Sequence, residues 1–152
     1  MEVMMSYRPV LLAIIAAVAL PAGASARSTQ LDIDRLRNET VHEVARRAIL
    51  AVDKEGRPLT FVLRIGRGQF LPPHGAQGGL RILTVVSGTL SWGDGDKVDQ
   101  AAERRFGPGS VIVVPAVGGQ HWAAARDGDV LLQGVFVRDG ALTPEAAAQL
   151  AR

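Results

Sequence analysis

Two histidines occupy similar positions in this 152-residue chain and have side chains that could act together. His74 follows two prolines and precedes a Gly-rich bend, and His121 follows a bend that contains a proline and two glycines. Because both lie at corners between apolar, strand-like runs, we expect them to share one pocket. An imidazole there could serve as a general base, bind a divalent metal or help to hold an anion.

Each histidine also has a simpler interpretation. His74 could be a solvated corner residue, and His121, beside Trp122, could be a core histidine with its own hydrogen bonds. The third histidine of the chain, His42, precedes Glu43, but the residues that follow do not supply the second histidine of a helical metalloprotease motif. His42 is therefore interpreted as a turn or surface residue.

Composition excludes several kinds of chemistry. The chain has no cysteine, so disulfides and thiolate catalysis are ruled out. It has 17 Lys and Arg against 15 Asp and Glu, and the basic residues are scattered rather than clustered. A surface that follows a phosphate backbone needs clustered basic residues, so we expect no nucleic-acid partner.

The first 26 residues have the features of a signal peptide. Arg8 precedes an apolar run that ends at Leu20, and Ala24-Ser25-Ala26 provides the small residues of a cleavage site. We expect cleavage after Ala26, export to the periplasm or the extracellular space, and no membrane attachment afterwards. The alternative is an uncleaved anchor, although the apolar run is short for a span of about 20 residues.

The remainder of the chain predicts an all-β domain. Short apolar or alternating runs are separated by regular turns, which favours a sandwich or barrel. Residues 27–47 form an N-terminal arm that could be a helix or include a strand at 41–44, and residues 48–140 form the barrel, beginning with a hairpin at 48–65. Residues 141–152 form a short C-terminal helix that Thr143 caps and Pro144 begins.

Two stretches of this barrel have glycine, proline and histidine residues at a characteristic spacing. The first has Gly68, His74 and Gly88, and the second has Gly109, Pro115, Gly118 and His121. This spacing resembles the paired motifs of the cupin superfamily, with one extra residue in the second bend. The resemblance covers residues 60–137 and implies a double-stranded β-helix, or jelly-roll barrel, with a pocket at one mouth.

The chain departs from the cupin motifs at the positions that usually bind metal. Ala76 replaces the second histidine and Arg81 replaces the glutamate, so two of the four usual ligands remain. A divalent transition metal (Fe, Mn, Ni or Zn) would then be coordinated by His74 and His121, with a side-chain oxygen of Gln77 or Gln120 as a further ligand. If Arg81 points inward as the family's glutamate does, it repels a metal and attracts an anion; a shift of strand register would instead turn it outward.

These features favour an exported cupin-like protein that binds a small polar or anionic ligand, with or without catalysis. The ligand-binding residues would be His74, Arg81, His121 and Gln120. The alternative is a cupin enzyme, either a metal-dependent dioxygenase or an isomerase in which a histidine is the general base and Arg81 steadies an oxyanion. A third possibility is an interaction protein, because cupins commonly pair edge to edge as homodimers.

Overall fold

The computed structural model of the protein describes residues 27–75 and 79–151, so the expected signal peptide and Gln77 lie outside the described residues. Residues 32–152 belong to one compact unit, and residues 27–31 contain no helix or strand. The elements in order are η1 (Ile33–Arg35), β1 (Glu39–Val41), β2 (Ala45–Val52), β3 (Pro58–Ile65), β4 (Phe70–His74), β5 (Leu80–Ser87), β6 (Leu90–Asp94), η2 (Gln100–Ala102), β7 (Arg104–Phe106), β8 (Val111–Val114), β9 (His121–Ala124), β10 (Val130–Val137) and α1 (Pro144–Leu150).

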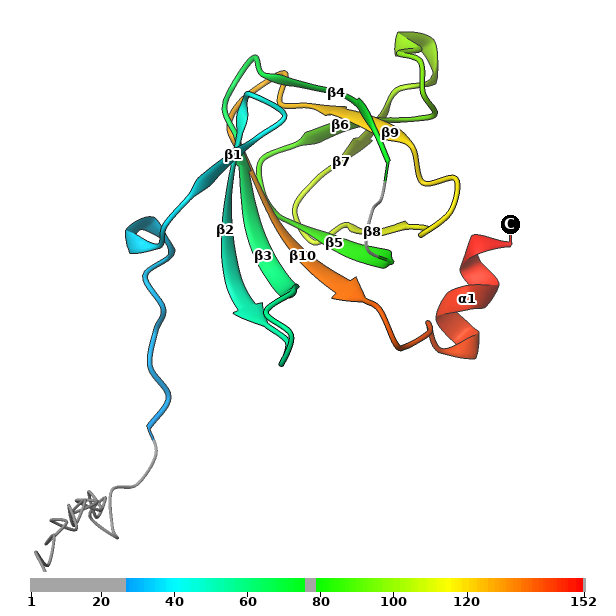
Figure 1. The fold of residues 1–152 in the computed structure, drawn as a ribbon. Helices are drawn as coiled ribbons and strands as arrows, with labels where there is room; N and C mark the ends of the chain where they lie inside the picture. Colours follow the sequence, from blue (N-terminus) through cyan, green and yellow to red (C-terminus); the bar gives the residue numbers. More distant parts are fainter. Residues whose placement is uncertain (1–26, 76–78, 152) are drawn as a thin grey trace, which may run out of the picture. The chain divides into compact units, whose positions relative to one another are not determined.

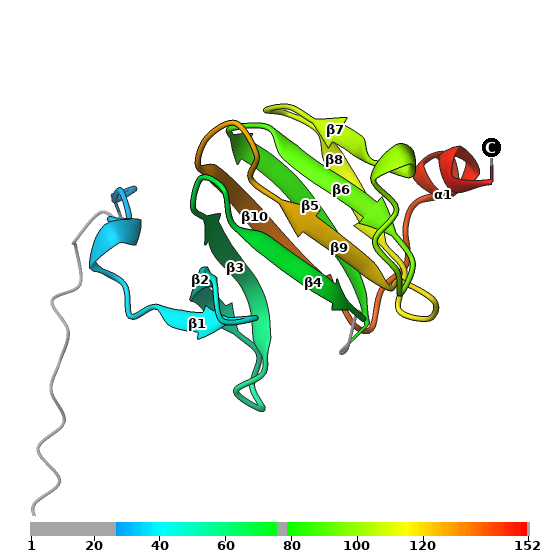
Figure 2. The ribbon, with the colours of Figure 1, turned by 90° about the horizontal axis from the view of Figure 1, so that it is seen from above.

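The strands form two antiparallel sheets that face each other, as the sequence predicts (Figures 1 and 2). One sheet has the order β1-β2-β3-β10-β5-β8, and the other has the order β4-β9-β6-β7. Alternate residues of each strand point between the sheets, which places an apolar core there. Its most buried large side chains include Ile65, Val85, Leu90 and Leu132.

Two prolines mark the edge of the smaller sheet. Pro72 and Pro73 lie in β4, and β4 is an outer strand that pairs only with β9. The pairing is irregular between Leu71 and His74, where the prolines interrupt it. Proline lacks the N–H that an inner strand needs, so the edge position expected from the sequence is confirmed.

The N-terminal segment is neither the longer helix nor the strand at 41–44 that its pattern allowed. A single 3-10 turn precedes β1, and residues 42–44 form the turn between β1 and β2. Within this turn His42 and Glu43 have left-handed backbones, with φ of 49° and 64°, as the central residues of a tight hairpin turn do. Strand β2 begins at Ala45, so the sheet includes residues that the sequence assigned to the arm.

The chain ends in the helix that the sequence predicts. Thr143 caps α1, because its hydroxyl accepts a hydrogen bond from the Ala146 N–H at 3.3 Å, and Pro144 occupies the first turn. In the described residues, no helix has the length and apolar character needed to span a membrane.

A close approach of an aromatic ring to the backbone provides a test of the packing. Gly134 in β10 pairs with Phe61 in β3, and a Cβ at Gly134 would lie 2.2 Å from the Phe61 ring. We expect Gly134→Ala to lower the free energy of unfolding by about 1–2 kcal/mol, because the ring must move out of its position. Urea unfolding measures this change. Gly128→Ala, whose Cβ meets nothing within 4 Å, should change stability by less than about 0.5 kcal/mol; an equal loss in both variants would contradict the prediction.

Candidate functional site

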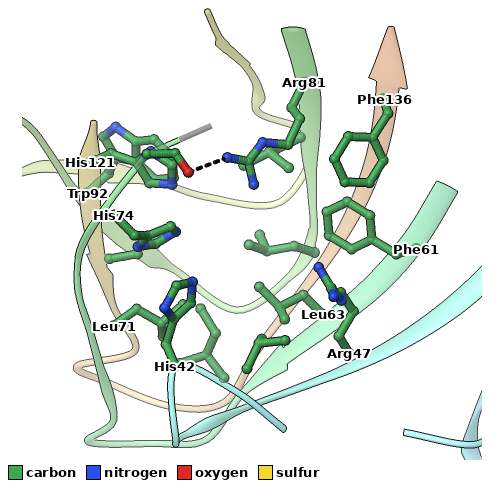
Figure 3. A pocket seen from close by; sticks show the side chains of 16 residues that line it. His42, Arg47, Phe61, Leu63, Leu71, His74, Arg81, Trp92, His121 and Phe136 are labelled. Carbon is green, nitrogen blue, oxygen red and sulfur yellow. Dashed lines mark hydrogen bonds between the residues drawn. The ribbon is translucent and has the colours of Figure 1, made fainter. Parts of the chain in front are cut away.

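A cavity of about 470 Å³ lies between the two sheets, within the usual size range of small-molecule sites. Figure 3 shows the three histidines and Trp92 along one side of the cavity, and Arg81, Arg47, Phe61 and Phe136 along the other. The polar or positively charged lining residues are His42, Arg47, His74, Arg81, Trp92 and His121. The apolar part includes Phe61, Leu63, Ile65, Leu71, Leu83, Leu132 and Phe136.

His74 and His121 lie directly opposite each other on the paired strands β4 and β9. Their ring centroids are 4.2 Å apart. Each Nδ1 lies 2.8 Å from a backbone carbonyl oxygen, that of Pro72 for His74 and that of Gly119 for His121. A carbonyl only accepts hydrogen bonds, so Nδ1 carries the proton in both rings and Nε2 keeps its lone pair for a ligand.

His42 joins this pair, which the sequence did not indicate. Its ring centroid lies 3.9 Å from that of His74, so the three histidines of the chain, together with Trp92 stacked on His121, form a row of rings (Figure 3). The β1–β2 turn places His42 there with a left-handed backbone that costs a non-glycine residue roughly 1–2 kcal/mol. His-Glu is not a usual turn sequence, so no local signal in the sequence singled out this residue.

Arg81 points into the cavity, in the position that the cupin resemblance implied. Its Nη2 donates to the Gly75 carbonyl oxygen at 3.0 Å, and its guanidinium carbon lies 5.9 Å from the centre of the Phe136 ring (Figure 3). Its Nε is buried and has no hydrogen-bond partner. Within residues 27–75 and 79–151, no carboxylate lines the cavity. Arg81 is therefore a cation without an anionic neighbour in the part of the wall that is described.

The electrostatics of the cavity keep its histidines neutral. Burial lowers the pKa of His121 to about 4; His74 and Arg81 act in the same direction, while the Gly119 hydrogen bond and Asp94 oppose them. Burial also lowers the pKa of His74, and His42 and Arg81 add to that effect. At neutral pH the cavity thus has uncharged imidazoles beside permanently charged guanidinium groups.

Gln120 does not line the cavity. It is exposed between the buried residues Gly119 and His121, and its Nε2 lies 4.0 Å from the position of a Cβ on Gly75, at the edge of the cavity lining. It lines a separate groove with residues of β8 and the Leu150 side chain. Of the residues expected to bind a ligand, the structure brings together His74, Arg81 and His121.

The cavity does not fit the metal centre that the cupin fold usually carries. In the part of the chain that the structure describes, no group of three or more His, Cys, Asp or Glu side chains is arranged to hold a metal ion. The three histidines follow one another in a row instead of converging on one point. Arg81 adds a positive charge where a metal site would use a carboxylate.

Comparison with solved structures identifies the fold. The polyketide cyclase RemF from Streptomyces resistomycificus has a TM-score of 0.55 at 16% identity, over 83% of this chain and 94% of that one. A Klebsiella pneumoniae protein with a double-stranded β-helix domain has a TM-score of 0.53 at 17% identity, over 76% and 95%. These similarities show that the chain has the double-stranded β-helix fold of the cupin superfamily.

A third similar structure is a chain in the complex of Rhodobacter sphaeroides SigE with the anti-sigma ChrR, with a TM-score of 0.53 and 25% identity. The match covers 70% of this chain and 51% of that chain, so this protein spans about half the length of that relative. No protein-family model and no curated protein matches the sequence.

Proposed function

We propose that this cupin-fold protein binds a small organic anion, such as a carboxylate, in the cavity between its sheets. Arg81 would pair with the anionic group. The Nε2 atoms of His74 and His121 keep their lone pairs, so they would accept hydrogen bonds from a hydroxyl or N–H group of the ligand. The apolar side chains of the cavity would hold the body of the ligand.

The observation that carries this proposal is that Arg81 has unused hydrogen-bond donors and no carboxylate beside it in the described cavity lining. A guanidinium has five N–H donors, and one of those of Arg81 is used in the described structure, by the Gly75 carbonyl oxygen. Its Nε is buried without a partner, so the Nη1 and Nη2 atoms carry the donors that remain for a ligand. A carboxylate can accept two parallel hydrogen bonds from a guanidinium, so it satisfies both the charge and the geometry.

Export fits this proposal. A protein released after Ala26 would meet small anions in the periplasm or outside the cell, and N-terminal sequencing of the exported chain tests the cleavage.

A thermal-shift screen of the full-length chain tests the proposed ligand class. Each small carboxylate is paired with its neutral amide, for example benzoate with benzamide and hexanoate with hexanamide, in buffer that contains a chelator. We expect carboxylates to raise the melting temperature in a concentration-dependent way, because a ligand that binds the folded state stabilises it. Equal shifts with the amides, or no shift with any acid, would contradict the proposal.

A second candidate function is acid–base catalysis in the same cavity, favoured by the lone pairs on Nε2 of His74 and His121. Either imidazole could remove a proton from a bound carbonyl compound while Arg81 stabilises the resulting oxyanion. Deuterium exchange from solvent into a bound carboxylate, followed by NMR, distinguishes the two: exchange that is lost in both His74→Asn and His121→Asn supports an isomerase. Binding without exchange supports a binding protein.

Metal titration distinguishes anion binding and metal-free acid–base catalysis from a metal-dependent cupin enzyme. Ferrous, manganous, nickel and zinc ions are added to the chain after chelator treatment. One equivalent retained by the wild type, and lost in both His74→Ala and His121→Ala, would show a metal centre and overturn the anion proposal. We expect no such stoichiometric metal.

A further inference from the structure

A second guanidinium lines the same cavity, at a position that neither cupin motif includes. Arg47 lies on β2 with its side chain turned towards the cavity. In the view of Figure 3, Arg81 lies at the upper end of the cavity and Arg47 at the lower end. Since no described lining residue carries a negative charge, the cavity has two positive groups within one largely apolar wall.

The strand register places the backbones of Arg47 and Arg81 far apart, along a diagonal of the larger sheet. Arg47 pairs with Leu63, Leu63 with Leu132, and Leu132 with Val85, which spans three strand spacings or about 14 Å. Arg81 lies four residues before Val85 on the same face of β5, a further distance of about 13 Å along the strand. The arginine backbones thus lie at opposite corners of the inner face, and their long side chains extend over it.

Aromatic side chains occupy the space between these corners. Phe61 and Phe136 line the cavity with ring centroids 5.4 Å apart. Phe136 pairs with Arg81 on the adjacent strand, and Phe61 lies two residues from Leu63, the partner of Arg47. A ligand that reaches from one arginine to the other must therefore cross an apolar surface.

Arg47 is held in place without losing its capacity to bind. Its Nε donates to Glu39 Oε1 at 2.7 Å, across the β1–β2 pair. The Glu39 side chain is 52% exposed, and an ion pair at such a site gains only a small Coulomb energy because solvent screens it. The positive charge of Arg47 still reaches the cavity, since it is among the causes that lower the pKa of both His42 and Arg81.

From this arrangement we infer that the ligand carries two anionic groups separated by an apolar body, one group paired with Arg81 and the other with Arg47. The inference rests on the proposed function, because it assigns the ligand class of that same cavity. A linear or aromatic dicarboxylate has this form. A monocarboxylate paired with Arg81 would leave Arg47 with Glu39 as its anionic partner among the described residues.

Isothermal titration of the full-length chain tests the inference with acids of matched length. The probes are adipate, suberate and sebacate against hexanoate, octanoate and decanoate, and terephthalate against benzoate. We expect the best dicarboxylate to bind about tenfold or more tighter than its monocarboxylate, the effect of one added charge-assisted hydrogen bond. This comparison uses the wild type and does not depend on the folding of any variant.

Two neighbouring arginines provide the matched variants. Arg47→Gln should reduce the preference for dicarboxylates to about threefold or less, while Arg46→Gln should leave it unchanged, because Arg46 is exposed and does not line this cavity. If Arg81→Gln abolishes binding but mono- and dicarboxylates bind equally well to the wild type, this inference is wrong and the proposed function stands. If no acid binds the wild type, both are wrong.

Discussion

Replacing Arg81 with methionine should weaken the binding of a carboxylate by about 100-fold and at the same time stabilise the ligand-free protein. Removing one partner of a buried, hydrogen-bonded charge pair typically costs 2–5 kcal/mol of binding energy, which corresponds to about 30-fold or more. The ligand-free protein should gain about 1 kcal/mol, because a half-buried cation with an unsatisfied Nε is replaced by an apolar chain of similar length. Titration calorimetry and urea unfolding measure the two effects.

The opposite signs of these effects distinguish a binding residue from a structural one. A structural arginine would lower stability when it is removed, whereas a residue kept for its ligand carries a cost in the ligand-free state. Arg67→Met provides the control, because Arg67 is exposed and outside the cavity. It should change neither affinity nor stability by more than about 0.5 kcal/mol. Unchanged affinity in Arg81→Met would remove Arg81 from the site.

Acidification from pH 7.5 to pH 4.5 should destabilise the protein by about 2–3 kcal/mol through His121 alone. The pKa of this residue is about 4 in the folded chain against an ordinary value of 6.5, and its side chain is 3% exposed. Between these values the unfolded chain binds a proton that the folded chain does not, so stability is fully present above pH 6.5 and is lost as the pH falls towards 4. A depression of this size corresponds to about 3 kcal/mol when the transition is complete. Urea unfolding at several pH values measures it.

His121→Gln should remove most of this pH dependence, because glutamine does not titrate. The pKa values of His74 and His42 are also lowered, chiefly by burial, so a smaller loss in the same direction should remain. The hydrogen bond from Arg126 lowers the pKa of Glu103. Protonation of this carboxylate therefore reduces stability only when the pH falls to about its ordinary pKa of 4.5 or below. An equal pH dependence in the wild type and His121→Gln would show that His121 does not have the lowered pKa.

Local sequence patterns were sufficient to predict the barrel. The strand runs, the edge prolines in β4 and the Thr143 cap each depend on neighbouring residues, and the structure confirms them. The motif spacing also indicated that His74 and His121 would meet, because both corners belong to a recognisable pair of motifs. Their direct pairing across β4 and β9 is the structural basis for that result.

The remaining part of the site could not be predicted because it comes from outside those motifs. His42 and Arg47 belong to a segment whose pattern allowed a helix or a strand, and its hairpin turn lacks the Asn or Gly that usually marks one. The hairpin predicted at 48–65 is the confirmed pairing of β2 with β3. The place of His42 and Arg47 depends instead on β2 beginning at Ala45 and pairing with β1, which the pattern of this segment does not specify. Similarly, the spacing of the second motif did not show that Gln120 would lie outside the cavity lining.

The most direct test of the anion-binding site is a crystal structure of the protein with a carboxylate from the screen bound to it. The account predicts carboxylate oxygens within hydrogen-bond distance of the Arg81 guanidinium, with the body of the ligand against Phe61 and Phe136. A ligand bound outside this cavity would contradict the account. So would a metal ion between the carboxylate and the Nε2 atoms of His74 and His121, because the site would then be a metal centre.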